Sequence, residues 1–499
     1  MKNMMKYILS LTAIATGLCS CEDYLDTLPD NRTTLDSPEA VSELLVSAYP
    51  DAAYYQFTEV MSDNVSEKGK GDYVQTQLEN TEAYFWKDHT TQADGTPIYY
   101  WNACYSAIAH ANHALEAIES VTNPEDYAAQ KGEALVARAY AHFMLVNLFA
   151  KPYDPVTADS DLGVPYVTES EKTVFKNYKR ETVGTIYKKL EADIVEGIKL
   201  IKDEVYTVPK YHFTKTSANA FAARFYLFMG NWDKVIEHAN IALGTDPVKM
   251  LRDWNGSYLN LTYDELKARY NSSEEPANLL LASAEAIWQQ GYIVYRYSLY
   301  SDIKDELFPT FGSPFEFSYR VAGYETMYHV PKFNQYKKRL GGVNANMYIG
   351  MLMAPLFTAE EVLLNRAEAY AMKKDNTKAF ADLEVFRSKR VKKYDSPIIT
   401  EQYLKDIYES EECKNNNFPL YPFYTVEDEQ LDVIRYILDL RRREFVHEGI
   451  RWFDIRRFHM QVVHKTQEGE EFVLPADDLR KVLQIPSQAI ASGLTPNPR

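Results

Sequence analysis

The sequence predicts an all-α fold in which helix pairs stack as a tetratricopeptide-like superhelix and carry a large irregular loop region with short strands. Three observations lead to this prediction. Apolar and small residues recur every three or four positions over long stretches of the chain. Residues 222–239 and 360–387 each show the small-residue and turn pattern of a repeated helix pair. Between these segments, residues 246–355 are rich in aromatic side chains and follow no steady period.

The helical elements can be justified in chain order. We expect helices over about 99–121, 127–149, 183–202, 217–229, 232–239, 360–387 (two helices) and 430–458, before a C-terminal coil. Ala222 and Ala223 place small residues where two helices cross closely, and Gly230 supplies the tight turn before Trp232. The mature chain therefore divides into a helical scaffold over 21–245, a loop-rich region over 246–355 and a second helical scaffold over 356–499.

Two irregular segments are candidates for binding loops. The larger is residues 246–355, and the smaller is residues 61–97, where Asp94-Gly95 marks a turn. Both contain many aromatic residues, which a disordered segment would lack. Binding residues usually lie on loops that a rigid scaffold holds in place. We therefore expect the ligand to be bound by these two segments.

The overall composition excludes several classes of protein. The 499 residues are 46% apolar, and no apolar run is long enough to span a membrane. With 54 basic and 71 acidic side chains the formal net charge is −17, which disfavours nucleic acid as a partner. The chain holds 38 Tyr, 23 Phe and 6 Trp, an unusual number of rings for a chain of this polarity.

The N-terminus carries the features of an export signal. Lys2 and Lys6 precede a short apolar stretch over residues 7–17, so residues 1–20 are predicted to be a signal peptide. Residues 18–21 (LCSC) resemble a bacterial lipobox, which makes Cys21 the expected lipidation site. A plain secretory peptide is the alternative. Acidic residues directly follow the anchor and resemble a surface-export tag: Glu22, Asp23 and Asp26.

Catalytic and metal-binding motifs are weak in this sequence. His110, His113 and Glu116 have a helical spacing that could ligate a metal, but no third strong ligand follows, so packing or surface histidines are favoured. No carboxylate pair stands in a glycosidase motif, and no GxSxG, P-loop or dinucleotide pattern occurs. We expect no enzyme activity and no cofactor. Cys104 and Cys413 could form a disulfide, but their spacing does not decide it.

Several motifs together resemble the SusD/RagB family. The strongest match is LRRREFVHEGIRWFDIRR over residues 440–457, in which Gly449 ends one helix and Trp452 lies in the next. A basic and aromatic stretch could also bind nucleic acid, but nearby acids can neutralise its arginines. The resemblance covers nearly the whole mature chain and includes residues 21–26, 101–118, 133–146, 163–165 and 483–486.

The resemblance implies a function and a cellular location. Members of the family are surface lipoproteins of the outer membrane that bind glycans, or sometimes peptides, and pair with a TonB-dependent, SusC-like transporter. The expected function is therefore non-catalytic glycan binding and delivery to such a transporter. Three alternatives stay open: a peptide- or glycopeptide-binding member of the same fold, a tetratricopeptide scaffold that binds only protein, and a hydrolase. In the family, the segment over 440–457 is scaffold.

Candidate ligand-binding residues follow from the chemistry of sugars. A pyranose ring stacks its apolar face on Trp or Tyr, while its hydroxyls bond to polar side chains. Trp86 lies in a polar loop with Asp88 nearby, and is expected either to stack on a sugar or to fold back as a cap on the first helix pair. Asp63 lies where family members often place ligand-side polar groups. The remaining candidates come from the central loops: Tyr295, Arg296, Tyr319 and Tyr324.

Overall fold

The computed structural model describes residues 35–71, 73–170, 177–309, 313–341, 346–392, 398–410, 413 and 418–499. The predicted signal peptide and the predicted lipidation site Cys21 lie outside these residues. Within them the chain forms many helices and three small antiparallel sheets, which confirms the predicted fold class. Among the described residues, no helix is both long enough and apolar enough to cross a membrane.

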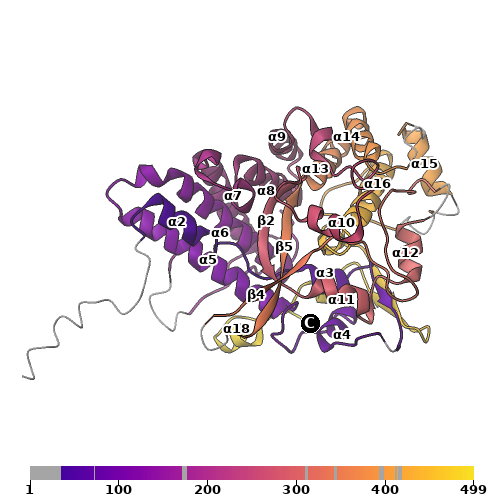
Figure 1. Ribbon diagram of the computed structural model, residues 1–499, viewed down its shortest axis with the longest axis horizontal. Helices are drawn as coiled ribbons and strands as arrows, with labels where there is room; N and C mark the ends of the chain where they lie inside the picture. Colours follow the sequence, from indigo (N-terminus) through magenta and orange to yellow (C-terminus); the bar gives the residue numbers. More distant parts are fainter. Residues whose placement is uncertain are drawn as a thin grey trace, which may run out of the picture.

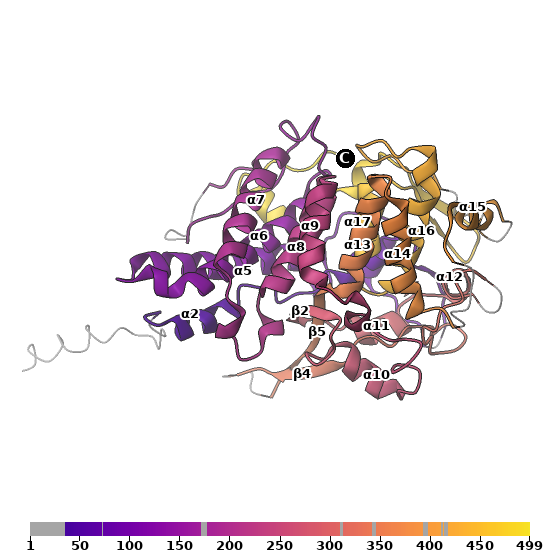
Figure 2. The ribbon, with the colours of Figure 1, turned by 90° about the horizontal axis from the view of Figure 1, so that it is seen from above.

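The long helices lie side by side in one array (Figures 1 and 2). Along this array α5 packs on α6, α6 on α7, α7 on α8, and α8 on α9. The array then continues across a long gap in the sequence, because α9 packs on α13, which packs on α14 and α16. The bounds are α5 Pro97–Ser120, α6 Ala128–Phe149, α7 Val183–Leu200, α8 Lys215–Phe228, α9 Trp232–Leu243, α13 Ala359–Met372, α14 Asn376–Ser388 and α16 Asp428–Glu444.

Local sequence signals set where these helices begin and how closely they approach. The Thr96 hydroxyl accepts a hydrogen bond from the backbone N–H of Tyr99, which caps α5. Thr214 and Ser217 form a reciprocal capping box at the start of α8. A Cβ atom on Gly132 would lie 2.8 Å from the carbonyl oxygen of Gly197. Glycine at this position therefore allows α6 and α7 to cross at close range.

The loop-rich region contains a three-stranded antiparallel sheet that lies along one side of the helix array (Figure 2). Its strand order is β2-β5-β4, so β5 is central. The strands are β2 Asn278–Glu285, β4 Gln335–Arg339 and β5 Tyr348–Thr358. A second, two-residue pairing joins β1 (Ser66–Glu67) to β3 (Tyr297–Ser298), and thus connects the two predicted binding loops.

Short helices also form where the sequence pattern shows no helical period. Such helices are too short for their periodicity to be seen, and packing on neighbours stabilises them. They are α2 Pro38–Leu45, α3 Tyr55–Val60, α4 Leu78–Tyr84, α10 Tyr263–Tyr270, α11 Trp288–Val294, α12 Ser301–Leu307, α15 Glu401–Glu409 and α18 Ser487–Ala491, whereas α17 Ile450–Arg457 lies within the segment over 430–458 that the sequence predicts to be helical.

The C-terminal part differs from the expected coil. After α17 the chain forms a hairpin of β6 (Val462–Lys465) and β7 (Glu471–Leu474), which packs against β1 of the N-terminal region. The segment over 430–458 forms two helices, as the sequence around Gly449 predicts: α16 ends at Glu444, Gly449 adopts a φ of +69°, and α17 begins at Ile450. The structure forms no disulfide bond between Cys104 and Cys413, and both side chains are buried.

Candidate functional site

Trp86 does not present an open ring face. Only 4% of the residue is exposed, its Nε1 donates a hydrogen bond to the carbonyl oxygen of Met61 at 2.9 Å, and its ring stacks on His464 at 4.4 Å. The expectation of an exposed stacking platform is therefore wrong. The folded-back alternative describes the side chain better, although the ring packs on the C-terminal hairpin rather than on the first helix pair.

Asp88 lies next to Trp86 and is largely exposed. Its carboxylate forms an ion pair with Arg499 at 2.6 Å, and about half of its side chain remains accessible to solvent. Trp86, Asp88, Arg480 and Arg499 line a cavity of about 220 Å³ together with residues of the C-terminal coil. Asp88 thus stays available for a ligand, while the ring beside it is used for packing.

Asp63 acts as an anchor between the 61–97 segment and the C-terminal helices. Its two carboxylate oxygens accept hydrogen bonds from Arg451 at 2.8 Å each, and Arg442 lies 3.7 Å away. Burial opposes the ionised form of this carboxyl, but the two arginines outweigh burial and hold its pKa well below the ordinary value. The side chain is 24% exposed. These contacts favour a structural role for Asp63.

Three of the four candidates from the central loops make internal contacts. Tyr295 is 2% exposed and packs beside Trp288, and Tyr319 is 7% exposed and donates a hydrogen bond to Glu444. Arg296 forms an ion pair with Glu67, which fixes β3 against β1. The structure therefore contradicts the expectation that these two tyrosine rings face a ligand.

Tyr324 is the exception among the central aromatic residues. Its side chain belongs to a turn closed by the pairing of Ala322 with His329, and 63% of the residue is exposed. A ring in this position can still stack on a ligand. The seven candidates are thus divided between the protein interior and separate surface positions, and the structure does not bring them together as one site.

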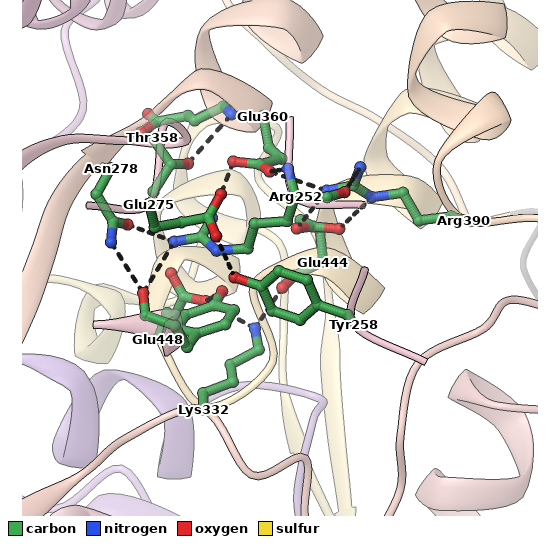
Figure 3. A network of polar contacts seen from close by, with 12 residues as sticks. Arg252, Tyr258, Glu275, Asn278, Lys332, Thr358, Glu360, Arg390, Glu444 and Glu448 are labelled. Carbon is green, nitrogen blue, oxygen red and sulfur yellow. Dashed lines mark hydrogen bonds and ion pairs between the residues drawn. The ribbon is translucent and has the colours of Figure 1, made fainter. Parts of the chain in front are cut away.

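A buried polar network lies where the loop-rich region meets the helical scaffold (Figure 3). Arg390, from the end of the second repeat, donates two hydrogen bonds of 2.9 Å to Glu444 and one of 3.0 Å to Glu360. Arg252 donates to the other oxygen of Glu360 at 2.9 Å. Lys332 donates to Glu448 at 2.6 Å. These charges are inaccessible to a ligand and instead hold the loop-rich region on the scaffold.

A large open groove lies between the sheet and the N-terminal helices. We call it the sheet groove, and its volume is about 900 Å³. One wall is the sheet β2-β5-β4, and the other is built from α2, α5, the start of α6 and residues 202–212. A volume of this size falls within the range of ligand-binding clefts. Figure 1 shows the sheet next to the N-terminal helices.

Strand register decides which side chains of the sheet face the groove. Ser283 pairs with Met353 and Glu285 with Met351, and all four side chains line the groove. On β4, Lys338 pairs with Ile349, and both line the groove. Because side chains alternate along a strand, the neighbours of Lys338 on β4 project from the opposite face. The sheet thus offers an apolar surface with a hydroxyl, a carboxylate and an amine.

Buried hydrogen bonds fix several side chains of the groove lining that do not belong to the sheet. Tyr49 donates to Glu133 Oε1 at 2.6 Å, and His212 Nδ1 lies 2.9 Å from the same oxygen. The rings of Tyr206 and His212 stack at 4.2 Å. Tyr49, Tyr206 and His212 all line the groove, together with the partly exposed Tyr211. The groove therefore combines apolar surface, phenolic rings and fixed polar groups.

The groove offers few groups arranged for catalysis. Tyr99 donates to Glu285 at 2.7 Å, and this contact engages one oxygen of the carboxylate. Burial, and then the charge of Glu285, raise the pKa of Asp94 to about 7, but Asp94 lies outside the groove lining. No three His, Cys, Asp or Glu residues in the described ranges could together hold a metal ion.

The groove residues were not among the predicted site residues. The sequence places α2, residues 202–212 and the three strands far apart, and no motif connects them. The sequence indicates only part of the groove, through the expectation that the loop-rich region over 246–355 supplies ligand contacts. The strands β2, β4 and β5 belong to that region, whereas the helical wall of the groove was not expected.

Comparisons with known proteins agree with this architecture. Residues 23–227 match a family model described as "Starch-binding associating with outer membrane", and residues 320–490 match the model described as "SusD family". A SusD-like protein of Formosa agariphila is 22% identical over 494 residues, which covers 91% of each chain.

Solved structures share the fold. A SusD superfamily protein from Bacteroides thetaiotaomicron superposes with a TM-score of 0.65 and 20% identity, over 93% of this chain and all of that chain. A protein described as a putative sugar binding protein, from Bacteroides vulgatus, gives a TM-score of 0.65 and 19% identity, over 93% and 99% of the two chains. The two matching family models together span most of the described residues. The chain therefore belongs to the SusD/RagB family.

Proposed function

We propose that this protein binds glycans in the sheet groove and does not cleave them. The observation that carries the proposal is an open groove of about 900 Å³ in a chain whose N-terminal half matches a starch-binding family model. The putative sugar binding protein from Bacteroides vulgatus, which shares the fold, supports the same ligand class.

The lining of the groove suits a polyhydroxylated ligand. A sugar ring has an apolar face that can rest on the partly exposed Met353 or on the ring of Tyr211. Its hydroxyl groups can donate to Glu285 and exchange hydrogen bonds with Ser283. A few directed polar groups on a mainly apolar surface are typical of small-molecule sites.

We also propose a cellular setting. The LCSC segment before residue 22 and the family resemblance support a lipid anchor at Cys21, and the family model described as associating with the outer membrane supports that location. In this setting the protein holds a glycan at the cell surface and passes it to a TonB-dependent, SusC-like transporter. An anchor at the chain terminus leaves the folded part free to move relative to the membrane.

Narrowing the sheet groove with a larger side chain is expected to weaken glycan binding. Ser283 is exposed on β2 and faces the groove, so Ser283→Trp places a large ring in the cleft on a strand position that tolerates aromatic residues. Titration calorimetry against soluble starch, β-glucan, xylan, mannan and pectin should identify a ligand of the wild-type protein. We expect the variant to lose affinity for that ligand by at least about tenfold, which corresponds to 1.4 kcal/mol.

The matched control adds the same ring elsewhere. Val463 is exposed on β6, outside the groove, and Val463→Trp should leave the affinity unchanged. If Asp88→Asn or Tyr324→Ala weakens binding while Ser283→Trp does not, the ligand is held by the loops predicted from the sequence and the groove assignment is wrong. New reducing ends released by purified protein would contradict binding without cleavage.

Replacing Cys21 by alanine is expected to release the protein from the membrane. A lipid anchor requires the thiol, and the apolar segment over residues 7–17 is too short to span a bilayer. Fractionation of cells that express the variant should show the protein in soluble fractions, whereas Cys19→Ala should remain with the outer membrane. Retention of Cys21→Ala in the membrane fraction would show that another element holds the protein there.

One observation favours peptide binding as a second candidate function. Among the described residues β4 pairs only with β5, so the opposite edge of β4 carries backbone groups that can pair with an extended peptide. Lys338 lies on β4 and its side chain lines the groove, so a peptide paired with this strand would lie beside the groove. A peptide library titrated against wild-type protein and Ser283→Trp distinguishes the two functions by the class of ligand that binds.

A further inference from the structure

The sheet groove carries an excess of negative charge. Two lysines, Lys202 and Lys338, line it. Five carboxylates line it as well: Glu39, Glu43, Asp51, Asp126 and Glu285. All of these except Glu285 are exposed residues on the groove walls, and Glu285 is half-buried. With its histidines counted as neutral, the groove lining therefore carries five negative and two positive charges.

These carboxylates are not neutralised by nearby cations. Within the described residues, none of the five comes within 4.0 Å of a lysine, arginine or histidine nitrogen. The contrast with the buried network is clear, because Glu360 and Glu444 there both bond to arginines. The negative charges of these five carboxylates therefore act directly on any ligand that enters the groove.

We propose that the sheet groove selects uncharged glycans and rejects glycans that carry carboxylate or sulfate groups. The proposal rests on the proposed function, since it names the ligand class of the same groove. A cleft lined by one sign of charge focuses the field and repels ions of that sign. Hydroxyl groups of a neutral sugar, in contrast, donate to carboxylates in charge-assisted hydrogen bonds, which are stronger than neutral ones.

The arrangement of the two lysines supports this selection. Lys338 lies on β4 and Lys202 follows α7, on opposite walls of the groove. Among the described residues that line the groove, no two cations lie on the same wall, whereas a built anion site requires cations that converge on one sulfate or carboxylate. Asp51 and Glu285 lie together on the groove wall, because the Asp51 carbonyl oxygen accepts a hydrogen bond from the Glu285 backbone N–H. Negative charge is therefore concentrated beside the sheet.

The test compares one glycan in two charge states. The neutral polysaccharide that binds wild-type protein is chemically sulfated, and both forms are titrated at about 50 mM and 500 mM NaCl. We expect the sulfated form to bind at least about tenfold more weakly at low salt, with the difference shrinking at high salt as charges are screened. A purely steric effect of sulfation would not depend on salt.

Charge variants assign the effect to the groove. In Glu43→Lys/Asp51→Lys, two exposed carboxylates of the groove become amines, and the ratio of sulfated to neutral affinity should rise at least about tenfold at low salt. Glu43→Gln/Asp51→Asn should give an intermediate ratio. The control Glu468→Lys/Asp477→Lys makes the same change in net charge outside the groove and should leave the ratio near that of wild type.

The results of these titrations separate three claims: the charge selection, the assignment of the binding site to the groove, and glycan binding itself. Equal or tighter binding of the sulfated form by wild-type protein overturns the charge selection, and so does an equal shift in the groove and control variants. Binding of neutral glycans that Ser283→Trp does not weaken overturns the groove assignment instead. If no glycan of either charge state binds, the proposed function itself is contradicted.

Discussion

Glu444→Gln is expected to lower the free energy of unfolding by about 3–5 kcal/mol, because it leaves the buried Arg390 with only one of its two carboxylate partners, Glu360. Glu444 and Arg390 are both almost completely buried and share two hydrogen bonds of 2.9 Å. Burial opposes ionisation of Glu444, but Arg390 outweighs it and lowers the pKa of this carboxyl. Tyr319 donates to the same carboxylate, so the substitution also disturbs the central loops. Urea unfolding monitored by circular dichroism measures the effect.

Two further variants test this explanation. Glu429→Gln removes an exposed ion pair with Lys374 and should lower the free energy of unfolding far less than Glu444→Gln does. The pair Glu444→Leu and Arg390→Met, made singly and together, forms a double-mutant cycle in which the double variant should be less destabilised than the sum of the single ones. Additive effects would show that the two charges do not depend on each other.

The helical scaffold could be predicted because its signals are local. Alanines on one face, a glycine turn and a capping residue lie within a few positions of each other, and the predicted second repeat over 360–387 corresponds to α13 and α14. The arginine-rich segment over 440–457 was expected to be neutralised scaffold. Arg441 does bond to Asp454 at 2.8 Å, whereas Glu444 bonds to Arg390 instead of an arginine of its own segment.

The burial of candidate rings could not be predicted, since distant segments cause it. Trp86 lies in a polar stretch of sequence, and the hairpin residue that covers its ring, His464, follows almost at the end of the chain. Tyr319 likewise meets Glu444, which is 125 residues away. Aromatic residues in polar loops therefore indicate ordered structure here, but not exposure.

The groove could not be predicted either, because the residues that line it come from separate segments of the chain. Its strand β2 is buried on both faces along most of its length, so the sequence over 278–284 shows no alternation of polar and apolar residues. Its polar lining comes from separate elements, such as Glu43 on α2 and Ser283 on β2. Only the folded arrangement brings these residues to one cleft.

Trp86→Ala is expected to destabilise the protein by about 3–5 kcal/mol, the cost of truncating a large buried side chain. The ring fills the space between Met61 and His464, and its Nε1 hydrogen bond would also be lost. Thermal unfolding should therefore show a clear fall in melting temperature. Tyr73→Ala, at a loop residue that is 75% exposed, should change stability by less than about 0.5 kcal/mol.

The backbone at this position allows a sharper version of the test. Trp86 adopts a φ of +50°, a left-handed conformation that costs most residues roughly 1–2 kcal/mol and that glycine adopts freely. Trp86→Gly should thus be less destabilised than Trp86→Ala, although it removes more atoms. The packing of the ring on His464 offsets this backbone cost in the native protein. If Trp86→Ala melts like wild type and instead weakens glycan binding, the ring contacts a ligand and its packing contributes little.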